Sequence, residues 1–102
     1  MDFKQMQDKI VKNAIAYGKK CNIAIDEDFA ILKLYEEVGE LAQAILIHRR
    51  KCRPEKYVSK EISKKELANE LADVLGMVVV NAHLQGIDLM DAIEKKWINK
   101  EK

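Results

Sequence analysis

Four acidic residues lie in two short stretches of otherwise apolar sequence. Glu37 and Glu40 form the first pair, Glu70 and Asp73 form the second, and leucine and alanine residues flank both. A spacing of three residues puts both carboxylates of a pair on one face of a helix, about one turn apart. Ionised carboxylates are rarely buried unless they are paired or bind a metal. Oxygen ligands without His or Cys favour Mg²⁺, or Mn²⁺, over zinc.

The two pairs would meet if their helices pack antiparallel. Four carboxylates that close would repel by several kcal/mol at an effective dielectric constant of about 20. The repulsion can be relieved by raised pKa values or by bound cations. Because Mg²⁺ keeps several waters and is usually completed by substrate phosphates, such a site suits phosphoryl or nucleotidyl chemistry. The alternative is four solvated carboxylates on the surface of amphipathic helices.

Periodic apolar residues predict a helical chain in which two long helices carry the acidic pairs. A first helix begins near Phe3 and ends near Gly18. Asp26 is the predicted N-cap of a second helix that continues to about Arg50, and a charged connector containing the proline follows, up to Ile62.

The second half of the chain predicts two further helices. Ser63 begins a capping-box pattern and would open a third helix that stops at Gly86. From Leu75 to Val80 that helix is apolar on every face, so we expect it to be buried. Asp88 would cap a fourth helix, with Trp97 in the core.

The predicted fold class is all-α: a single domain over residues 1–102, similar to a four-helix bundle, with two long antiparallel central helices. A helix that is apolar all round in so short a chain indicates that another subunit covers part of its surface. We therefore expect a homo-oligomer, either a homodimer or a homotetramer.

Composition narrows the classes of partner. The 18 Lys and Arg nearly balance the 17 Asp and Glu, so nothing global indicates nucleic acid or an anionic membrane. The longest apolar run, Val74 to Val80, is too short to span a bilayer, and the N-terminus lacks the pattern of a signal peptide. The two cysteines, Cys21 and Cys52, are expected to be free thiols. We therefore expect a cytoplasmic protein without a membrane partner.

The paired motifs resemble a known family. Glu36-Glu37-Val38-Gly39-Glu40 followed by Glu70-Leu71-Ala72-Asp73 is similar to the Glu-Glu-x-x-Glu and Glu-x-x-Asp motifs of the MazG family of all-α nucleoside triphosphate pyrophosphohydrolases. The tail resembles the closing Lys-x-x-Asn-x-x-Arg pattern of that family, with Lys96, Asn99 and Lys102 in its three positions.

The resemblance implies Mg²⁺-dependent hydrolysis of nucleoside triphosphates between the α and β phosphates, with release of a monophosphate and pyrophosphate. It implies that the four carboxylates Glu37, Glu40, Glu70 and Asp73 hold the metal. Lys96 and Asn99 would contact phosphate or sugar. Glu36, and Glu37 beside it, are the candidate catalytic carboxylates. Glu36 would act as the general base, as a group that hydrogen-bonds and orients a metal ligand, or as an additional ligand.

Three other features have two interpretations each. Asn81 continues the stripe of Glu70 and either faces the substrate or is satisfied inside the bundle. His48 lies eleven residues from Glu37, roughly 16 Å along a helix, so it is expected to be a helix-end histidine. The basic residues between Arg49 and Lys56 could contact phosphate or nucleic acid. We expect instead that they only mark the end of a helix, where basic residues are common.

Two alternatives to the triphosphate hydrolase stay open. One is a phosphoribosyl-ATP pyrophosphohydrolase, which shares the acidic motifs. The other is a non-catalytic helical dimerisation module of the same fold, which would bind no metal.

Overall fold

The computed structural model describes residues 1–99, which form helices and turns without a strand. The elements follow in the order α1 (Phe3–Cys21), α2 (Glu27–His48), the 3₁₀ turn η1 (Pro54–Lys56), α3 (Lys60–Leu84), α4 (Leu89–Ile93) and the π-helical turn η2 (Glu94–Ile98). The predicted all-α fold with two long central helices is confirmed.

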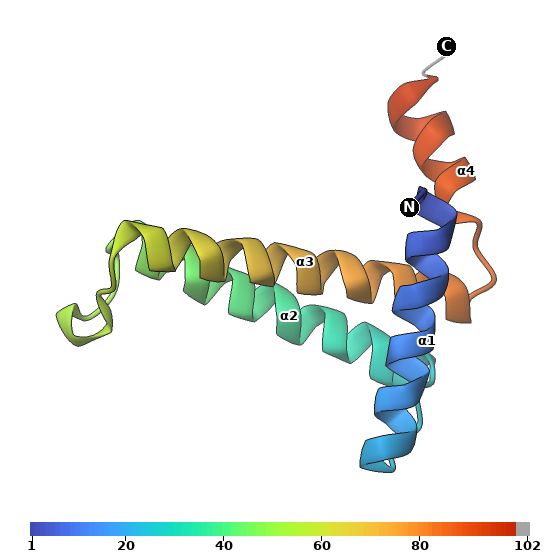
Figure 1. Ribbon diagram of the computed structural model, residues 1–102, viewed down its shortest axis with the longest axis horizontal. Helices are drawn as coiled ribbons and strands as arrows, with labels where there is room; N and C mark the ends of the chain where they lie inside the picture. Colours follow the sequence, from blue (N-terminus) through green and yellow to red (C-terminus); the bar gives the residue numbers. More distant parts are fainter. Residues whose placement is uncertain (100–102) are drawn as a thin grey trace.

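Helices α2 and α3 form a long antiparallel hairpin, as Figure 1 shows. Helix α1 crosses the hairpin near the end where α2 begins and α3 stops, and α4 with η2 forms an arm that points away from the hairpin (Figure 1). The radius of gyration is 16.2 Å, against about 13 Å for a compact domain of 100 residues. The single chain is therefore open, with its long helices covered on only part of their surface.

Each helix starts at a side chain that accepts a hydrogen bond from a backbone N–H three residues later. Asp2 accepts at 2.8 Å, Asp26 at 2.9 Å, Ser59 at 3.2 Å and Asp88 at 3.0 Å. These bonds satisfy N–H groups that have no partner within the helix. The predicted caps Asp26 and Asp88 are confirmed.

The predicted start of the third helix at Ser63 is wrong. Ser59 is the N-cap, and the helix begins one turn earlier, at Lys60. Ser63 is instead 2% exposed and lies 2.7 Å, Oγ to Nδ1, from His48, the last residue of α2. Two serines four residues apart offer competing caps, and the buried contact between Ser63 and His48 accounts for the earlier start.

Side-chain hydrogen bonds fix both ends of the hairpin. At the turn, Lys60 donates to the carbonyl of His48 beside the contact between Ser63 and His48. At the other end, Asn81 donates from Nδ2 to the carbonyl oxygen of Ala30, across the helix pair, at 2.9 Å, and to that of Met77 at 2.7 Å. A buried amide that is hydrogen-bonded specifies one alignment of the two helices, because sliding them past each other would leave the amide without a partner. These contacts set the register of α2 against α3.

The core is small and lies near the end of the hairpin that α1 crosses. Ala30 on α2 and Val79 and Val80 on α3 are buried there. The expectation that all of residues 75–80 are buried is wrong at Leu75, which is exposed. Trp97, predicted to be in the core, is 73% exposed on η2. Leu75 and Trp97 thus lie on surfaces that the single chain leaves open.

Helix α1 continues past Gly18, its predicted end, to Cys21, where Asn22 takes a left-handed φ of 55°. Gly18 is buried because the chain folds back against it. A Cβ at this position would lie 2.5 Å from Cγ1 of Ile25 and 2.8 Å from the carbonyl oxygen of Ile23. Only glycine lets the linker pass this close to α1 and place α2 across it.

Within residues 1–99, α3 is the one helix long and apolar enough to cross a membrane by length and composition. The core helix of a soluble protein passes the same test, so this is weak evidence for a span. Moreover, α3 carries Glu70 and Asp73 near its middle. Charged groups at that depth are costly in a bilayer.

Candidate metal centre

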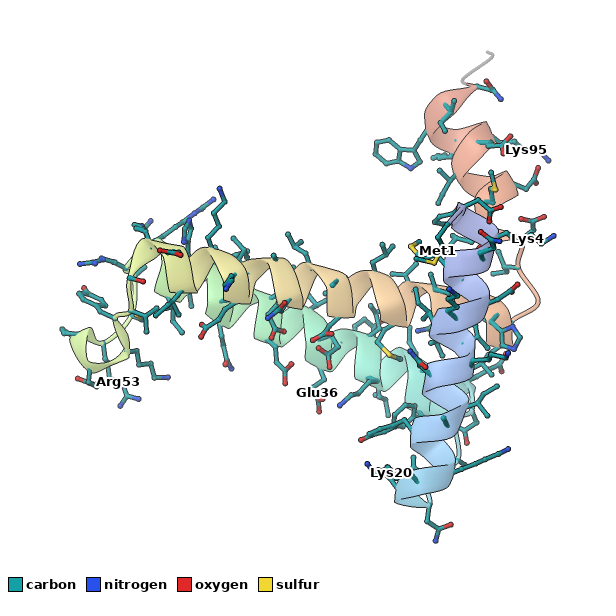
Figure 2. All side chains as sticks on the ribbon, in the orientation of Figure 1. Met1, Lys4, Lys20, Glu36, Arg53 and Lys95 are labelled. Carbon is teal, nitrogen blue, oxygen red and sulfur yellow. The ribbon has the colours of Figure 1, made fainter. Side chains whose placement is uncertain are left out.

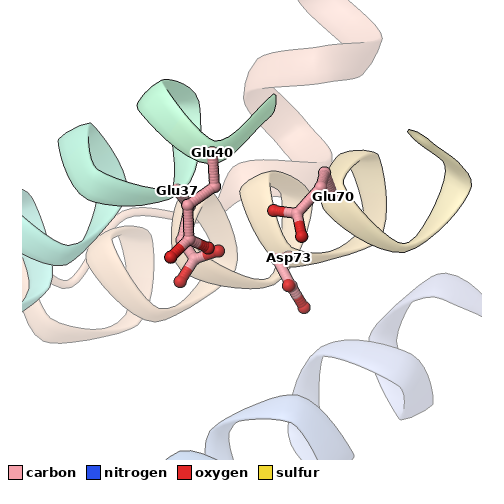
Figure 3. A group of neighbouring side chains, drawn as sticks. All are labelled: Glu37, Glu40, Glu70 and Asp73. Atoms are coloured by element: carbon pink, nitrogen blue, oxygen red, sulfur yellow. The ribbon is translucent and has the colours of Figure 1, made fainter. Parts of the chain in front are cut away.

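The hairpin brings together the four carboxylates that the sequence singled out. Figure 3 shows Glu37 and Glu40 on α2 facing Glu70 and Asp73 on α3. One oxygen from each of the four side chains lies within 4.8 Å of the corresponding oxygens of the other three. The juxtaposition predicted from the two i, i+3 pairs is therefore present in the folded chain.

The spacing of these oxygens suits a divalent cation. Mg²⁺ binds oxygens at about 2.0–2.1 Å, so opposite ligands lie about 4.2 Å apart, and Ca²⁺ allows about 5 Å. The Oε2 atoms of Glu37 and Glu70 are buried and accept no hydrogen bond within residues 1–99. Buried carboxylate oxygens without donors are costly, and a cation is the partner that would satisfy them. The residues present therefore fit a metal ion.

The electrostatics of the four carboxylates also favour a bound cation. Burial, followed by the charge of Glu40, raises the pKa of Glu37 to about 7. Burial, followed by the charges of Glu40 and Asp73, also raises the pKa of Glu70. At about 4.8 Å, a pair of ionised carboxylates repels by about 3 kcal/mol at an effective dielectric constant of 20. Without a cation, Glu37 therefore takes up a proton near neutral pH.

Glu36 lies outside this cluster. Its carboxylate is exposed and accepts a hydrogen bond from Nζ of Lys33 at 2.5 Å. The same ammonium group is 3.9 Å from Oε1 of Glu37. Lys33 was not among the residues predicted from the sequence, although its position four residues before Glu37 places both on one helical face. Figure 2 labels Glu36 on the hairpin.

Two grooves adjoin the carboxylates. The first, of about 240 Å³, lies between the hairpin and α1 and is mostly apolar beside Glu37 and Asp73; Ile10 and Ala14 of α1 line it with Met77 of α3. The second, of about 330 Å³, lies farther along the hairpin beside Glu40 and Glu70. It is more polar, and it is lined by Gln43, Glu66 and Asn69 among others. An elongated ligand lying across the carboxylates would extend into either groove.

The structure places Asn81 inside the fold and not in either groove. It is buried, and its Nδ2 bonds the carbonyls of Ala30 and Met77. Its Oδ1 is buried without a partner within the described residues. These contacts favour the interpretation of Asn81 as a residue that joins α2 to α3.

The predicted substrate contacts near the C-terminus are distant from the carboxylates of the same chain. Lys96 lies in η2 and Asn99 follows it, on the arm that points away from the hairpin (Figures 1 and 2). Lys102 lies outside the described residues. The basic residues after α2 lie at the hairpin turn, where Arg50 stacks 5.0 Å from the ring centroid of Tyr57 and Arg53 pairs with Glu55.

An antiparallel helical hairpin that carries four converging carboxylates defines a class of all-α metal-binding protein. Residues 27–102, about three quarters of the chain, match the profile of the MazG nucleotide pyrophosphohydrolase domain. The chain therefore belongs to the MazG nucleotide pyrophosphohydrolase family, whose members depend on divalent metal ions.

A curated relative also matches. The chain is 38% identical over 63 residues to the uncharacterized protein YvdC of Bacillus subtilis (strain 168). The aligned segment covers 60% of this chain and 59% of the relative. The match thus spans less than two thirds of the relative's length. No solved structure matches the chain significantly.

The raised pKa values predict how the stability of the metal-free protein depends on pH. The folded state keeps the proton of Glu37 up to about pH 7, whereas the unfolded chain releases it near 4.5. Raising the pH through this window therefore favours unfolding, and Glu70 acts in the same direction. Urea denaturation in EDTA should show the free energy of unfolding falling by roughly 2 kcal/mol between about pH 5 and about pH 8.

A Glu37→Gln variant tests the origin of this slope, because glutamine stays neutral at every pH. It should flatten the profile, whereas Glu61→Gln, an exposed acid of α3 outside the cluster, should leave the slope unchanged. A profile in the unaltered protein that is flat, or that rises with pH, would contradict the assignment. Protein concentration is held fixed, because self-association shifts apparent stability.

Proposed function

We propose that this protein is a Mg²⁺-dependent nucleoside triphosphate pyrophosphohydrolase that cleaves between the α and β phosphates, releasing a nucleoside monophosphate and pyrophosphate. The observation that carries this proposal is the convergence of four carboxylate oxygens within 4.8 Å. Family membership supports nucleotide pyrophosphohydrolase chemistry in general. The ion, the cleaved bond and the triphosphate substrate are the parts we add.

Glu37, Glu40, Glu70 and Asp73 would hold the metal in this proposal. When bound, Mg²⁺ would neutralise phosphate charge and lower the pKa of a coordinated water. The four side chains come from two helices whose register is fixed by buried hydrogen bonds, so they are positioned before the substrate arrives. Mn²⁺ has similar ligand preferences and is an expected substitute.

Glu36 and Glu37 are the proposed catalytic carboxylates, with different positions. Glu37 is 7% exposed and lies within the cluster, so it acts first as a ligand. Glu36 is exposed at its edge, where it can accept a proton and return it to solvent. Its hydrogen bond to Lys33 keeps it close to the cluster.

The exposed surface supports a homodimer or a homotetramer. The chain exposes 7932 Å², against about 5,900 Å² expected for a compact monomer of 11.7 kDa. Apolar side chains contribute, including Tyr35 and Val38 on α2 and Leu71 and Leu75 on α3. Tyr35 and Val38 lie two residues from Glu37 and Glu40, roughly opposite them around the helix. A second copy would cover this face and leave the carboxylates accessible.

A second copy would also give Lys96 and Asn99 access to a site. Their arm points away from the hairpin of its own chain (Figure 1). We propose that they contact phosphate or sugar, together with the carboxylates of a partner chain. A role for Asn81 in substrate binding would require it to give up its hydrogen bonds across the hairpin. We therefore propose that Asn81 positions the carboxylates by holding α2 against α3.

The proposal includes a cytoplasmic location, where nucleoside triphosphates are abundant. Cys21 and Cys52 are free thiols, as a reducing compartment permits. We propose neither a membrane nor a nucleic-acid partner. The basic residues at the hairpin turn are accounted for in part by local contacts, such as Arg50 with Tyr57 and Arg53 with Glu55.

A product assay tests the reaction directly. Nucleoside and deoxynucleoside triphosphates, with phosphoribosyl-ATP beside them, are incubated with Mg²⁺ or with EDTA. We expect a monophosphate product and pyrophosphate only with the metal. Glu70→Gln should reduce the rate by at least about 100-fold, because a missing ligand distorts the metal site. The matched variant Glu61→Gln should retain full activity.

The other products separate the alternatives. Turnover of phosphoribosyl-ATP and of no other substrate would identify the protein as a phosphoribosyl-ATP pyrophosphohydrolase. Release of a diphosphate and orthophosphate would retain the metal site and reject the proposed bond. No turnover, together with no rise in melting temperature on adding Mg²⁺ or Mn²⁺, would reject the enzyme in favour of the interaction module.

Sedimentation equilibrium tests the oligomer. We expect a mass two or four times that of the 11.7 kDa chain at micromolar concentration. Leu71→Glu, which puts a charge on the exposed apolar stripe of α3, should shift the mass toward the monomer. Glu61→Lys, on the same helix outside that stripe, should leave it unchanged. A monomeric unaltered protein would contradict the proposed assembly.

A further inference from the structure

Within residues 1–99, Lys33 is the basic residue that forms an ion pair with a member of the carboxylate cluster. Its Nζ lies 2.5 Å from Oε1 of Glu36 and 3.9 Å from Oε1 of Glu37. Of the ion pairs found within residues 1–99, the contact with Glu37 is the one that involves a proposed metal ligand. The Lys33 side chain is 32% exposed, so its ammonium group is accessible from solvent.

The position of Lys33 is on the α1 side of the cluster. It lies four residues before Glu37, toward the start of α2, and so on the same helical face. Tyr17 of α1 lies in its neighbourhood. The apolar groove that opens beside Glu37 is lined by Ile10 and Ala14 of the same helix. A ligand that extends from the carboxylates toward α1 therefore passes near the ammonium group.

The hydrogen bonds of Lys33 leave capacity for a further acceptor. An ammonium group carries three N–H donors. One donates to Glu36, and the distance to Glu37 is longer than a hydrogen bond. Lys33 therefore has donors available for an incoming anion without breaking its bond to Glu36.

Charge balance identifies the kind of anion. Two divalent cations would offset the four carboxylates and leave the charge of a polyphosphate to be offset by other groups. A metal-loaded cluster would also weaken the attraction between Glu37 and Lys33, because the charge of Glu37 would then be neutralised. A mobile ammonium group at the edge of a metal site matches a non-bridging phosphate oxygen, which lysine binds as a point charge.

We propose that Lys33 binds the phosphate chain of the nucleotide once the carboxylates hold their metal, and that Glu36 positions Lys33 for this contact. The inference rests on the proposed function, and it assigns Lys33 to the substrate and not to the metal. Lys33 and Glu36 thus act together at the side of the cluster nearest α1: Lys33 binds the phosphate, and Glu36 holds Lys33 in position through its hydrogen bond.

Binding of bare inorganic pyrophosphate to the Mn²⁺-loaded protein, measured by calorimetry, isolates this contact from base recognition. Lys33→Met should weaken pyrophosphate binding by about tenfold or more and leave the affinity for Mn²⁺ alone equal or tighter. Lys33→Arg should restore most of the pyrophosphate affinity, because it keeps the charge. Lys64→Met, an exposed lysine of α3, is the matched control and should change neither affinity.

Glu36→Gln is a second, milder variant. It keeps Lys33 but removes its charged anchor, so it should weaken pyrophosphate binding by a smaller factor, about two- to fivefold. In the hydrolysis assay, Lys33→Met should raise KM more than it lowers kcat if the contact is made in the ground state. A general loss of folding would lower Mn²⁺ affinity as well and would be visible as a lower melting temperature.

The outcomes separate this inference from the proposed function. If the unaltered protein binds Mn²⁺ and pyrophosphate and Lys33→Met binds both equally well, the role of Lys33 is wrong and the metal site stands. If Lys33→Met loses Mn²⁺ affinity in parallel with pyrophosphate affinity, Lys33 is a structural counter-ion of the cluster and the proposal is overturned. If the unaltered protein binds neither probe, the proposed function and the role of Lys33 fail together.

Discussion

The repulsion among four carboxylates is the constraint on which the rest of this structure depends. Glu37, Glu40, Glu70 and Asp73 are held closer together than four ionised groups would lie by themselves. Two of their oxygens are buried without a donor among residues 1–99. Such an arrangement costs stability unless protons or cations compensate it. A bound cation would relieve this repulsion, and this relief is the physical basis of the proposed metal site.

The fold supplies what is needed to hold this arrangement. Side-chain hydrogen bonds join α2 to α3 at both ends of the hairpin. Ser63 contacts His48 at the turn, where the bond is partly buried, and Asn81 donates to Ala30 at the other end, where it is buried. They fix the register that places the two acidic pairs opposite each other. Gly18 lets the linker turn tightly, so that α1 crosses beside the cluster and forms the apolar groove. The residues that hold the hairpin together are thus different from the four carboxylates that they position.

The sequence was sufficient to predict the two long helices and the convergence of the four carboxylates, because both follow from local spacing. Two i, i+3 acidic pairs predict converging carboxylates once their helices pair, and Asp26 and Asp88 identify their helix starts by side-chain chemistry. Predictions failed where the answer depends on what lies around a helix. Ser63 read as a cap because its burial against His48 is a long-range contact. Trp97 and Leu75 read as core because apolar periodicity does not distinguish a chain's own core from a surface left open. Lys33 was not predicted because a single lysine on a helix is usually a solvated surface residue. Only its contacts with Glu36 and Glu37 connect it to the site.

The four carboxylates are proposed to bind one or more divalent cations between α2 and α3. Crystals grown with Mn²⁺ and measured near the manganese absorption edge test it most directly, because an anomalous difference map locates the metal without reference to activity. The account predicts strong peaks within bonding distance, about 2.2 Å, of oxygens from both Glu37 and Glu70, with Glu40 and Asp73 completing the site. A well-ordered hairpin without such a peak, or a metal bound elsewhere while the carboxylates stay apart from it, would contradict the account.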